Sequence, residues 1–148
     1  ETIPTLQEVL QLFTPTAINL LIEVKSPPPW SSQEIKQLIQ LLATSRCIVI
    51  SFDHDLLHRL QQLAPQMICG YGVTNITKYS VKYVKTLNRI SPLILPHFSL
   101  ILKEPTVTQA LLKAGCEIIT WTVDQESIAN QVFHNNIVKI ITNNLLKD

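Results

Sequence analysis

Glycine is scarce in this chain, with only 3 among 148 residues. Average usage is about 7%, so the sequence has little material for the glycine-rich loops that surround the phosphates of nucleotides. Neither the Walker spacing nor the dinucleotide-binding spacing is present. The scarcity of glycine therefore argues against a nucleotide-binding fold that depends on such a loop.

An excess of charge is also missing, because 12 Lys and Arg residues stand against 11 Asp and Glu, for a net charge of +1. The chain has no general attraction to nucleic acid or to anionic membranes, and we expect no nucleic-acid partner. No apolar run reaches the ~18 residues that a membrane span requires, and the chain starts without a secretory signal. A hydrophobic share of 46% is typical of a folded chain, and we expect a single domain over residues 1–148.

Cysteine is sparse and scattered. Cys47, Cys69 and Cys116 each adjoin an apolar run, and none lies close to another in the sequence. These spacings support neither a zinc site nor a disulfide framework. We therefore expect buried, reduced thiols, which favours a reducing compartment and a cytoplasmic location.

The chain does contain an alternation of apolar runs with amphipathic helical patterns. Near-continuous apolar runs are typical of strands buried on both faces of a parallel sheet, and their alternation with helices predicts an α/β fold. Ser31 and Glu34 form a capping-box pattern, Asp53 is a candidate N-cap, and Pro105 suits an early helical position. Strands are predicted over 17–25, 47–52, 67–73, 91–95, 116–123 and 137–142, and helices over 5–13, 31–42, 53–63, 77–87, 105–114 and 124–133.

Two charged residues stand at the end of the first strand-like run. Glu23 and Lys25 are two positions apart, so their side chains point to the same face of the strand. Ligands of α/β barrels and open sheets bind at the carboxyl ends of the strands. A carboxylate and an ammonium group at such an end can hold a divalent cation and an anionic group, respectively. A plain ion pair at the strand exit is the alternative, and the pattern alone slightly favours it.

Aromatic residues mark the ends of two further runs. Trp121 lies near the end of the run over 116–123, where it either forms an apolar wall for a ligand, or belongs to the core or caps a barrel. Phe52 follows Ser51 at the end of the second run. From the pattern we interpret Ser51 as a small polar turn residue and Phe52 as a packing residue.

The histidines assemble no catalytic arrangement by pattern. His54 and His58 are four residues apart on a predicted helix, but no third metal ligand follows, and their polar neighbours indicate a solvated face. His97 follows the fourth apolar run, and we expect it to lie away from the mouth of the site. His134 stands in an asparagine-rich turn and is expected at the surface.

Five short segments stand in order over essentially the whole chain. They are Ile3–Leu10, Ile22–Lys25, Ser51-Phe52, Trp121–Asp124 and Ile140–Thr142. No single piece is specific, but together, by their order and spacing, they resemble the C-terminal part of a glycerophosphodiester phosphodiesterase. The resemblance implies a TIM (β/α)8 barrel, here a partial barrel that covers about the last six strands.

The resemblance also implies roles for individual residues. Glu23 would be a ligand of a divalent metal ion, Ca or Mg, and Lys25 would be catalytic, beside the substrate phosphate. Trp121 would line the substrate pocket, and Phe52 would add more weakly to its apolar wall. The physical chemistry agrees, because a hard cation prefers carboxylate oxygens and a phosphodiester requires positive charge.

The family reaction hydrolyses a small-molecule glycerophosphodiester to glycerol 3-phosphate and an alcohol, with a divalent ion and with histidines that transfer protons. Those histidines and two further acidic ligands precede the segment that Ile3–Leu10 matches. His58-Arg59 is no substitute, because it lies inside a helix after the wrong strand. We therefore expect the 148 residues alone to be inactive.

One departure from the family pattern lies near the end of the chain. The family usually has Thr-Asp where this chain has Thr142-Asn143, so the change either weakens the last loop or has only a structural effect.

A degenerate, non-catalytic barrel that binds phosphate or a partner is the second hypothesis, and an unrelated α/β enzyme acting on a phosphorylated metabolite is the third. Because six strands cannot close an eight-stranded barrel, we expect association with a missing N-terminal segment or with another copy.

Overall fold

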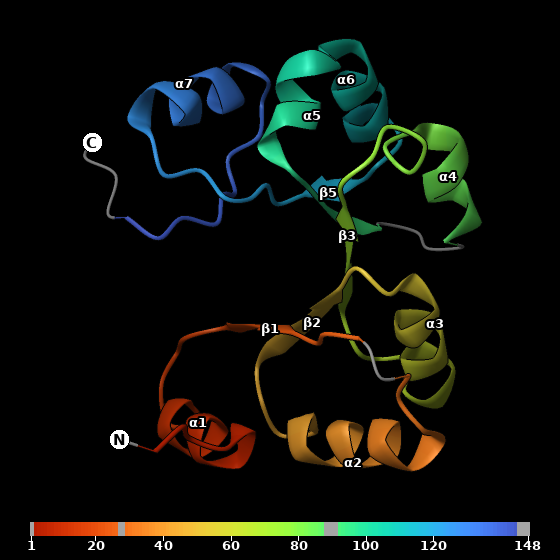
Figure 1. Ribbon diagram of the computed structural model, residues 1–148, viewed down its shortest axis with the longest axis vertical. Coiled ribbons are helices and arrows are strands. Elements are labelled where there is room, and N and C mark those ends of the chain that lie inside the picture. The colour runs from red at the N-terminus through yellow and green to blue at the C-terminus, as the bar shows by residue number, and fades with distance from the viewer. Residues whose placement is uncertain (1, 27–28, 88–91, 145–148) are drawn as a thin grey trace. The chain divides into compact units, whose positions relative to one another are not determined.

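The computed structural model of the chain describes residues 2–26, 29–87 and 92–144. The chain forms two compact units, Glu1–Gly70 and Tyr71–Asp148, and both combine strands with helices (Figure 1). The strands follow one another in the sheet in chain order, β1-β2-β3-β4-β5. The predicted alternation of strand and helix is therefore the organisation of the described residues, and it confirms an α/β fold.

The first unit is built on a parallel pair of strands. Strand β1 pairs with β2 so that Leu20 lies opposite Cys47 and Glu23 opposite Ile50. Leucines on one side of the helices α2 and α3 are buried, as are Ile35 and Val49, because the helical periodicity gathers the apolar side chains on one stripe. The elements are α1 (Leu6–Phe13), β1 (Leu20–Glu23), α2 (Ser32–Leu42), β2 (Cys47–Ser51), α3 (His54–Leu63) and the start of β3 (Cys69–Val73).

Side chains cap the amino ends of these helices, where four backbone N–H groups have no partner within the helix. The capping box predicted at Ser31 and Glu34 is present. The predicted N-cap Asp53 is also confirmed, because its carboxylate accepts a hydrogen bond from the backbone N–H of Leu56 at 3.0 Å. That bond is the main reason why the pKa of Asp53 lies below its usual value.

The second unit repeats the architecture. Strand β4 pairs in parallel with β5, with Leu93 opposite Glu117. Helix α6 begins at Pro105, and Gly115 follows it with a φ of 82°, a conformation that glycine adopts without a steric penalty. The elements are α4 (Val81–Thr86), β4 (Leu93–Pro96), α5 (Phe98–Lys103), α6 (Pro105–Lys113), β5 (Glu117–Ile118) and α7 (Glu126–His134).

The last predicted strand, over 137–142, is present only as an isolated parallel bridge between Thr120 and Ile140. Backbone hydrogen bonds still hold it, because the N–H of Ile141 donates to the carbonyl of Thr120 at 2.7 Å. The strand predicted over 116–123 is likewise reduced to two residues, and Ser91 of the strand predicted over 91–95 lies outside the described residues. The periodicity missed α5 altogether, because six residues are too few to show a helical pattern.

The three cysteines form no disulfide bond with one another. Cys69 and Cys116 are buried, whereas Cys47 is only half-buried. Burial raises the pKa of the Cys47 and Cys116 thiols above the ordinary value, because desolvation disfavours the thiolate. Within the described part of the chain, no helix is long and apolar enough to cross a membrane.

Candidate functional site

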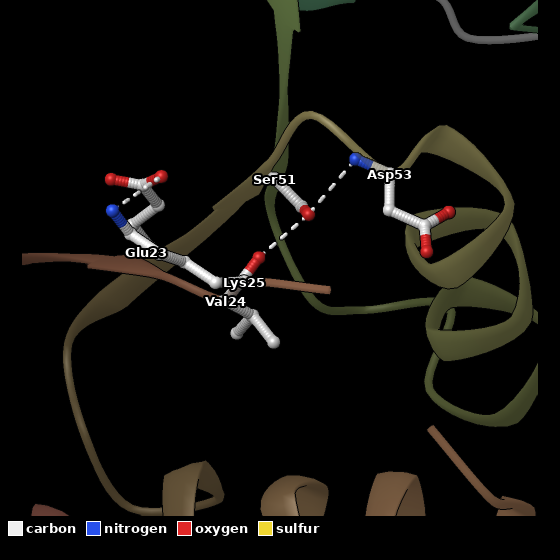
Figure 2. A network of polar contacts seen from close by, with 5 residues as sticks. All are labelled: Glu23, Val24, Lys25, Ser51 and Asp53. Atoms are coloured by element: carbon white, nitrogen blue, oxygen red, sulfur yellow. Dashed lines mark hydrogen bonds and ion pairs between the residues drawn. The ribbon is translucent and has the colours of Figure 1, made fainter. Parts of the chain in front are cut away.

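Glu23 and Lys25 meet at the carboxyl end of β1, as their spacing predicts. Figure 2 shows the two side chains turned toward each other, with Lys25 Nζ 3.7 Å from Glu23 Oε1. Both remain accessible, with 38% of the Glu23 side chain and 81% of the Lys25 side chain exposed. An exposed ion pair of this length contributes little to stability. A ligand can therefore separate the two side chains with little loss of folding stability.

A buried hydroxyl fixes the strand end that carries this pair. Ser51, only 2% exposed, donates from Oγ to the carbonyl oxygen of Val24 at 2.7 Å (Figure 2). The Oγ of Ser51 also accepts a hydrogen bond from the backbone N–H of Asp53 at 3.1 Å. Val24 lies between Glu23 and Lys25, so Ser51 ties the backbone of the pair to the end of β2 and to the cap of α3. The sequence pattern missed this role, since one serine at a strand end carries no distinctive signal.

The loop after Lys25 is held by a second pair of contacts. The indole Nε1 of Trp30 donates to the carbonyl oxygen of Lys25 at 3.1 Å, and Arg59 Nη1 donates to the carbonyl oxygen of Trp30 at 2.7 Å. Arg59 lies on α3, as predicted, and serves this loop. His54, expected on a solvated face of the same helix, is only 7% exposed, so this expectation is wrong for His54.

Phe52 lies between Ser51 and Asp53 with 41% of its surface exposed. The interpretation from the pattern, that Phe52 is a packing residue, is thus only partly correct. Because successive residues of an extended chain point to opposite sides, Phe52 projects away from the buried Ser51. Its exposure leaves an aromatic surface near the end of β2.

Trp121 belongs to the second unit, in the segment that follows β5. Its indole Nε1 donates to the carbonyl oxygen of Leu95 at 2.8 Å, so the ring is fixed against the end of β4. The imidazole of His97 lies edge-on to this ring, with centroids 5.0 Å apart. A bridge also joins the backbones of His97 and Trp121. The parallel pairing of the two segments therefore brings His97 beside Trp121, a contact that the sequence pattern did not predict.

A third polar group ties the last described loop to the segment after Trp121. The carboxylate of Asp124 accepts hydrogen bonds from the backbone N–H of Asn143 at 2.7 Å and from its side-chain amide at 3.1 Å. The Thr142 hydroxyl donates to the same carboxylate at 3.2 Å. These donors hold the pKa of Asp124 below its usual value, with the Asn143 backbone contributing most. Asn143 thus has a structural role that an ionised aspartate cannot fill, since it has no side-chain donor.

The described residues do not gather the ligands of a metal site. Among residues 2–26, 29–87 and 92–144, no group of three or more His, Cys, Asp or Glu side chains gathers in a way that could hold a metal ion. Glu23 is thus a single carboxylate at a strand end, whereas Ca²⁺ takes six to eight oxygen ligands. The residues on these segments therefore do not by themselves fit a complete divalent-cation site.

Comparison with solved structures defines the class of fold. The chain superposes on an Oleispira antarctica phosphodiesterase solved in complex with the product sn-glycerol-3-phosphate, with a TM-score of 0.79 and 18% identity, covering 94% of this chain and 57% of the other. A glycerophosphodiester phosphodiesterase from Parabacteroides distasonis gives a TM-score of 0.77 at 20% identity over 94% of this chain and 59% of the other. This likeness confirms the predicted fold class, a partial TIM barrel.

The sequence comparison then identifies the family. The model of the glycerophosphoryl diester phosphodiesterase family matches residues 1–147, and the chain belongs to this family. A glycerophosphodiester phosphodiesterase of Caldanaerobacter subterraneus subsp. tengcongensis is 26% identical, over 96% of this chain and 58% of the relative. The chain thus spans about half the length of the curated relatives that it matches.

Removing the Ser51 hydroxyl should loosen the end of β1. In Ser51→Ala the carbonyl of Val24 and the N–H of Asp53 both lose a partner next to a buried position. We expect the free energy of unfolding to fall by about 1–3 kcal/mol in urea denaturation. Ser45→Ala is the matched control, because none of the hydrogen bonds described for Ser45 uses its hydroxyl. Equal stability of the two variants would contradict this role of Ser51.

Asn143→Asp should weaken the last loop in a pH-dependent manner. The depressed pKa of Asp124 means that its hydrogen bonds stabilise the fold above the unfolded-state pKa of about 3.9 and lose that effect as the pH falls through the folded value. A second carboxylate removes the amide donor and adds repulsion. We expect a lower melting temperature than wild type at pH 7 and a smaller difference near pH 3. A pH-independent difference would argue against this charge effect.

Proposed function

We propose that this chain supplies part of the substrate site of a glycerophosphodiester phosphodiesterase. In the complete protein, the reaction would hydrolyse a glycerophosphodiester to glycerol 3-phosphate and an alcohol. One observation supports the proposal beyond family membership. Glu23 and Lys25 are the two charged residues of the segment Ile22–Lys25, and they lie together, accessible, at a strand end. Strand ends of this kind are where α/β barrels bind their ligands.

Lys25 would bind and neutralise the phosphate. Its ammonium group is 81% exposed and has only a loose partner in Glu23, so a phosphodiester oxygen can replace that partner. A fixed positive charge also stabilises the additional negative charge that develops when water attacks the phosphorus atom. Ser51 and Trp30 bind the backbone carbonyls of Val24 and Lys25, so the backbone that carries this side chain is held in place.

Glu23 would be one ligand of a divalent cation, Ca or Mg. When bound, such an ion withdraws charge from the phosphate oxygens. The described residues supply a single carboxylate, so the other ligands must come from outside them.

Trp121 and Phe52 would provide apolar surface for the carbon skeleton of the substrate. The indole of Trp121 is fixed by its hydrogen bond to Leu95, and Phe52 is 41% exposed. The Oleispira antarctica structure contains sn-glycerol-3-phosphate, and this ligand is the natural probe for the present chain.

The isolated 148 residues should not hydrolyse glycerophosphocholine in the presence of Mg²⁺ or Ca²⁺, because the residues described here offer a single carboxylate for the metal. We expect release of choline at the background rate, measured with a coupled choline assay. Hydrolysis well above background would contradict this expectation of inactivity.

Binding provides the direct test of the proposed roles. Lys25→Gln should weaken the affinity for sn-glycerol-3-phosphate about tenfold, measured by calorimetric titration. Lys139→Gln is the matched control, because Lys139 is an exposed lysine whose ammonium nitrogen lies 3.0 Å from a carboxylate oxygen of Glu117 in a comparable ion pair. If Lys25→Gln binds sn-glycerol-3-phosphate as wild type does, or if Lys139→Gln weakens the affinity equally, the proposed role of Lys25 is contradicted.

We also propose that the open edge of β1 associates with a second copy when no other segment covers it. Leu20 and Val24 donate backbone hydrogen bonds toward β2, so the backbone groups of Leu21 and Glu23 point to the other side of β1. Ile18 and Leu21 expose 53% and 38% of their surface beside this edge. Light scattering of the 148-residue chain should give a mass above that of the monomer, and a clean monomer would contradict this proposal.

A further inference from the structure

The end of β4 carries a histidine whose two ring nitrogens are used unequally. Nδ1 of His97 lies 2.8 Å from the hydroxyl of Ser99 and accepts a hydrogen bond from the backbone N–H of Ser99 at 3.3 Å. A backbone N–H can only donate, so Nδ1 must be the acceptor, and in the neutral ring the hydrogen then resides on Nε2. Nε2 has no hydrogen-bond partner among the described residues.

The ring is held in place by the segments around it. It lies edge-on to Trp121, with centroids 5.0 Å apart, and beside Phe98, with centroids 4.4 Å apart. The backbone N–H of His97 donates to the carbonyl of Val73, and that of Phe98 donates to the carbonyl of Trp121, both at 3.0 Å. The Trp121 indole is fixed in turn by Leu95. His97 is thus a preorganised donor rather than a mobile surface side chain.

Capping of α5 alone does not explain a histidine at this position. His97 is the N-cap of α5, but Asp, Asn, Ser and Thr are the side chains that serve this role best. Each would satisfy the N–H of Ser99 without placing a second donor next to an aromatic ring. Both His97 and Trp121 are half-buried, so neither residue is fully enclosed by the fold.

The protonation state suits a neutral hydrogen-bond donor. Burial lowers the pKa of His97 from its ordinary value, and the positive charge of Lys103 adds to the effect. At neutral pH the imidazole is therefore uncharged and carries its hydrogen on Nε2.

We propose that His97 and Trp121 form a ligand subsite in which the Nε2–H of His97 donates a hydrogen bond to an oxygen of the glycerol phosphate group, while Trp121 covers its carbon atoms. This inference rests on the proposed function and adds a substrate-positioning residue to it. An aromatic ring next to a fixed donor is the chemistry that recognises a short polyol or its phosphate ester. The acceptor is a hydroxyl or a phosphoryl oxygen.

The first test uses the wild-type chain and the ring nitrogens of His97. ¹⁵N-detected NMR of the 148-residue chain should show the Nε2–H form, and titration with sn-glycerol-3-phosphate should shift Nε2 and leave Nδ1 nearly unchanged. Parallel titrations with glycerol and with inorganic phosphate identify the acceptor, since the compound that carries it reproduces the shift. A His97 resonance that stays unchanged at saturating sn-glycerol-3-phosphate overturns the proposal.

Two substitutions separate ligand binding from capping. His97→Asn keeps a short acceptor for the N–H of Ser99 but removes the donor at the Nε2 position, whereas His97→Gln keeps an amide donor near that position and loses the cap. We expect His97→Asn to melt as wild type does and to bind sn-glycerol-3-phosphate about tenfold more weakly. His97→Gln should bind more tightly than His97→Asn although it is less stable.

The outcomes distinguish this inference from the proposed function. Wild-type affinity in His97→Asn shows that His97 is only a cap, and it overturns the subsite even where Lys25→Gln loses affinity and the phosphodiesterase assignment stands. A shifted His97 resonance together with an unaffected Lys25→Gln variant supports the subsite and contradicts the role of Lys25. No binding in the wild-type chain overturns both.

Discussion

Parallel pairing of strands is the constraint on which the other features of this chain depend. In a parallel sheet every strand ends on the same side, so each strand–helix connection begins where a ligand can be held. Glu23 and Lys25, Phe52, His97 and Trp121 all stand at or just after strand ends. The hydroxyl of Ser51 extends the pairing of β1 and β2 by one further contact, at the carbonyl of Val24, and thereby fixes the Glu23–Lys25 pair.

The buried and the exposed polar groups of the chain have different roles. Those that are buried or capped, such as Ser51 and Asp53, are satisfied by backbone partners and set the geometry of the strand ends. Those that are exposed, such as Glu23 and Lys25, make a single loose contact with each other. Leaving a buried polar group without a hydrogen bond destabilises the fold, whereas an exposed group can bind water instead. The buried and capping groups therefore make the strand ends rigid, and the exposed groups can bind a ligand.

The departure of Thr142-Asn143 from the family pattern has a physical explanation in the same terms. Asp124 is an ionised acceptor, and Asn143 supplies it with both a backbone and a side-chain donor. A carboxylate in place of the Asn143 amide would face another carboxylate across a hydrogen-bond distance. Of the two interpretations open from the sequence, the structural one is therefore the better supported, and it makes the last described loop firmer rather than weaker.

The strands and helices that depend on local chemistry could be predicted from the sequence. Continuous apolar runs gave the strands, the Ser31–Glu34 box and Asp53 gave the starts of α2 and α3, and the period of two placed Glu23 and Lys25 on one face. Short or irregular elements escaped it: α5 has too few residues for a period, and the segment 137–142 is held by backbone hydrogen bonds without forming a regular strand. Two contacts became visible only in the folded chain: the hydrogen bond from Ser51 to the carbonyl of Val24, and the packing of His97 against Trp121. Both contacts join residues more than twenty positions apart, and such contacts are decided by the pairing of strands, which no local pattern encodes.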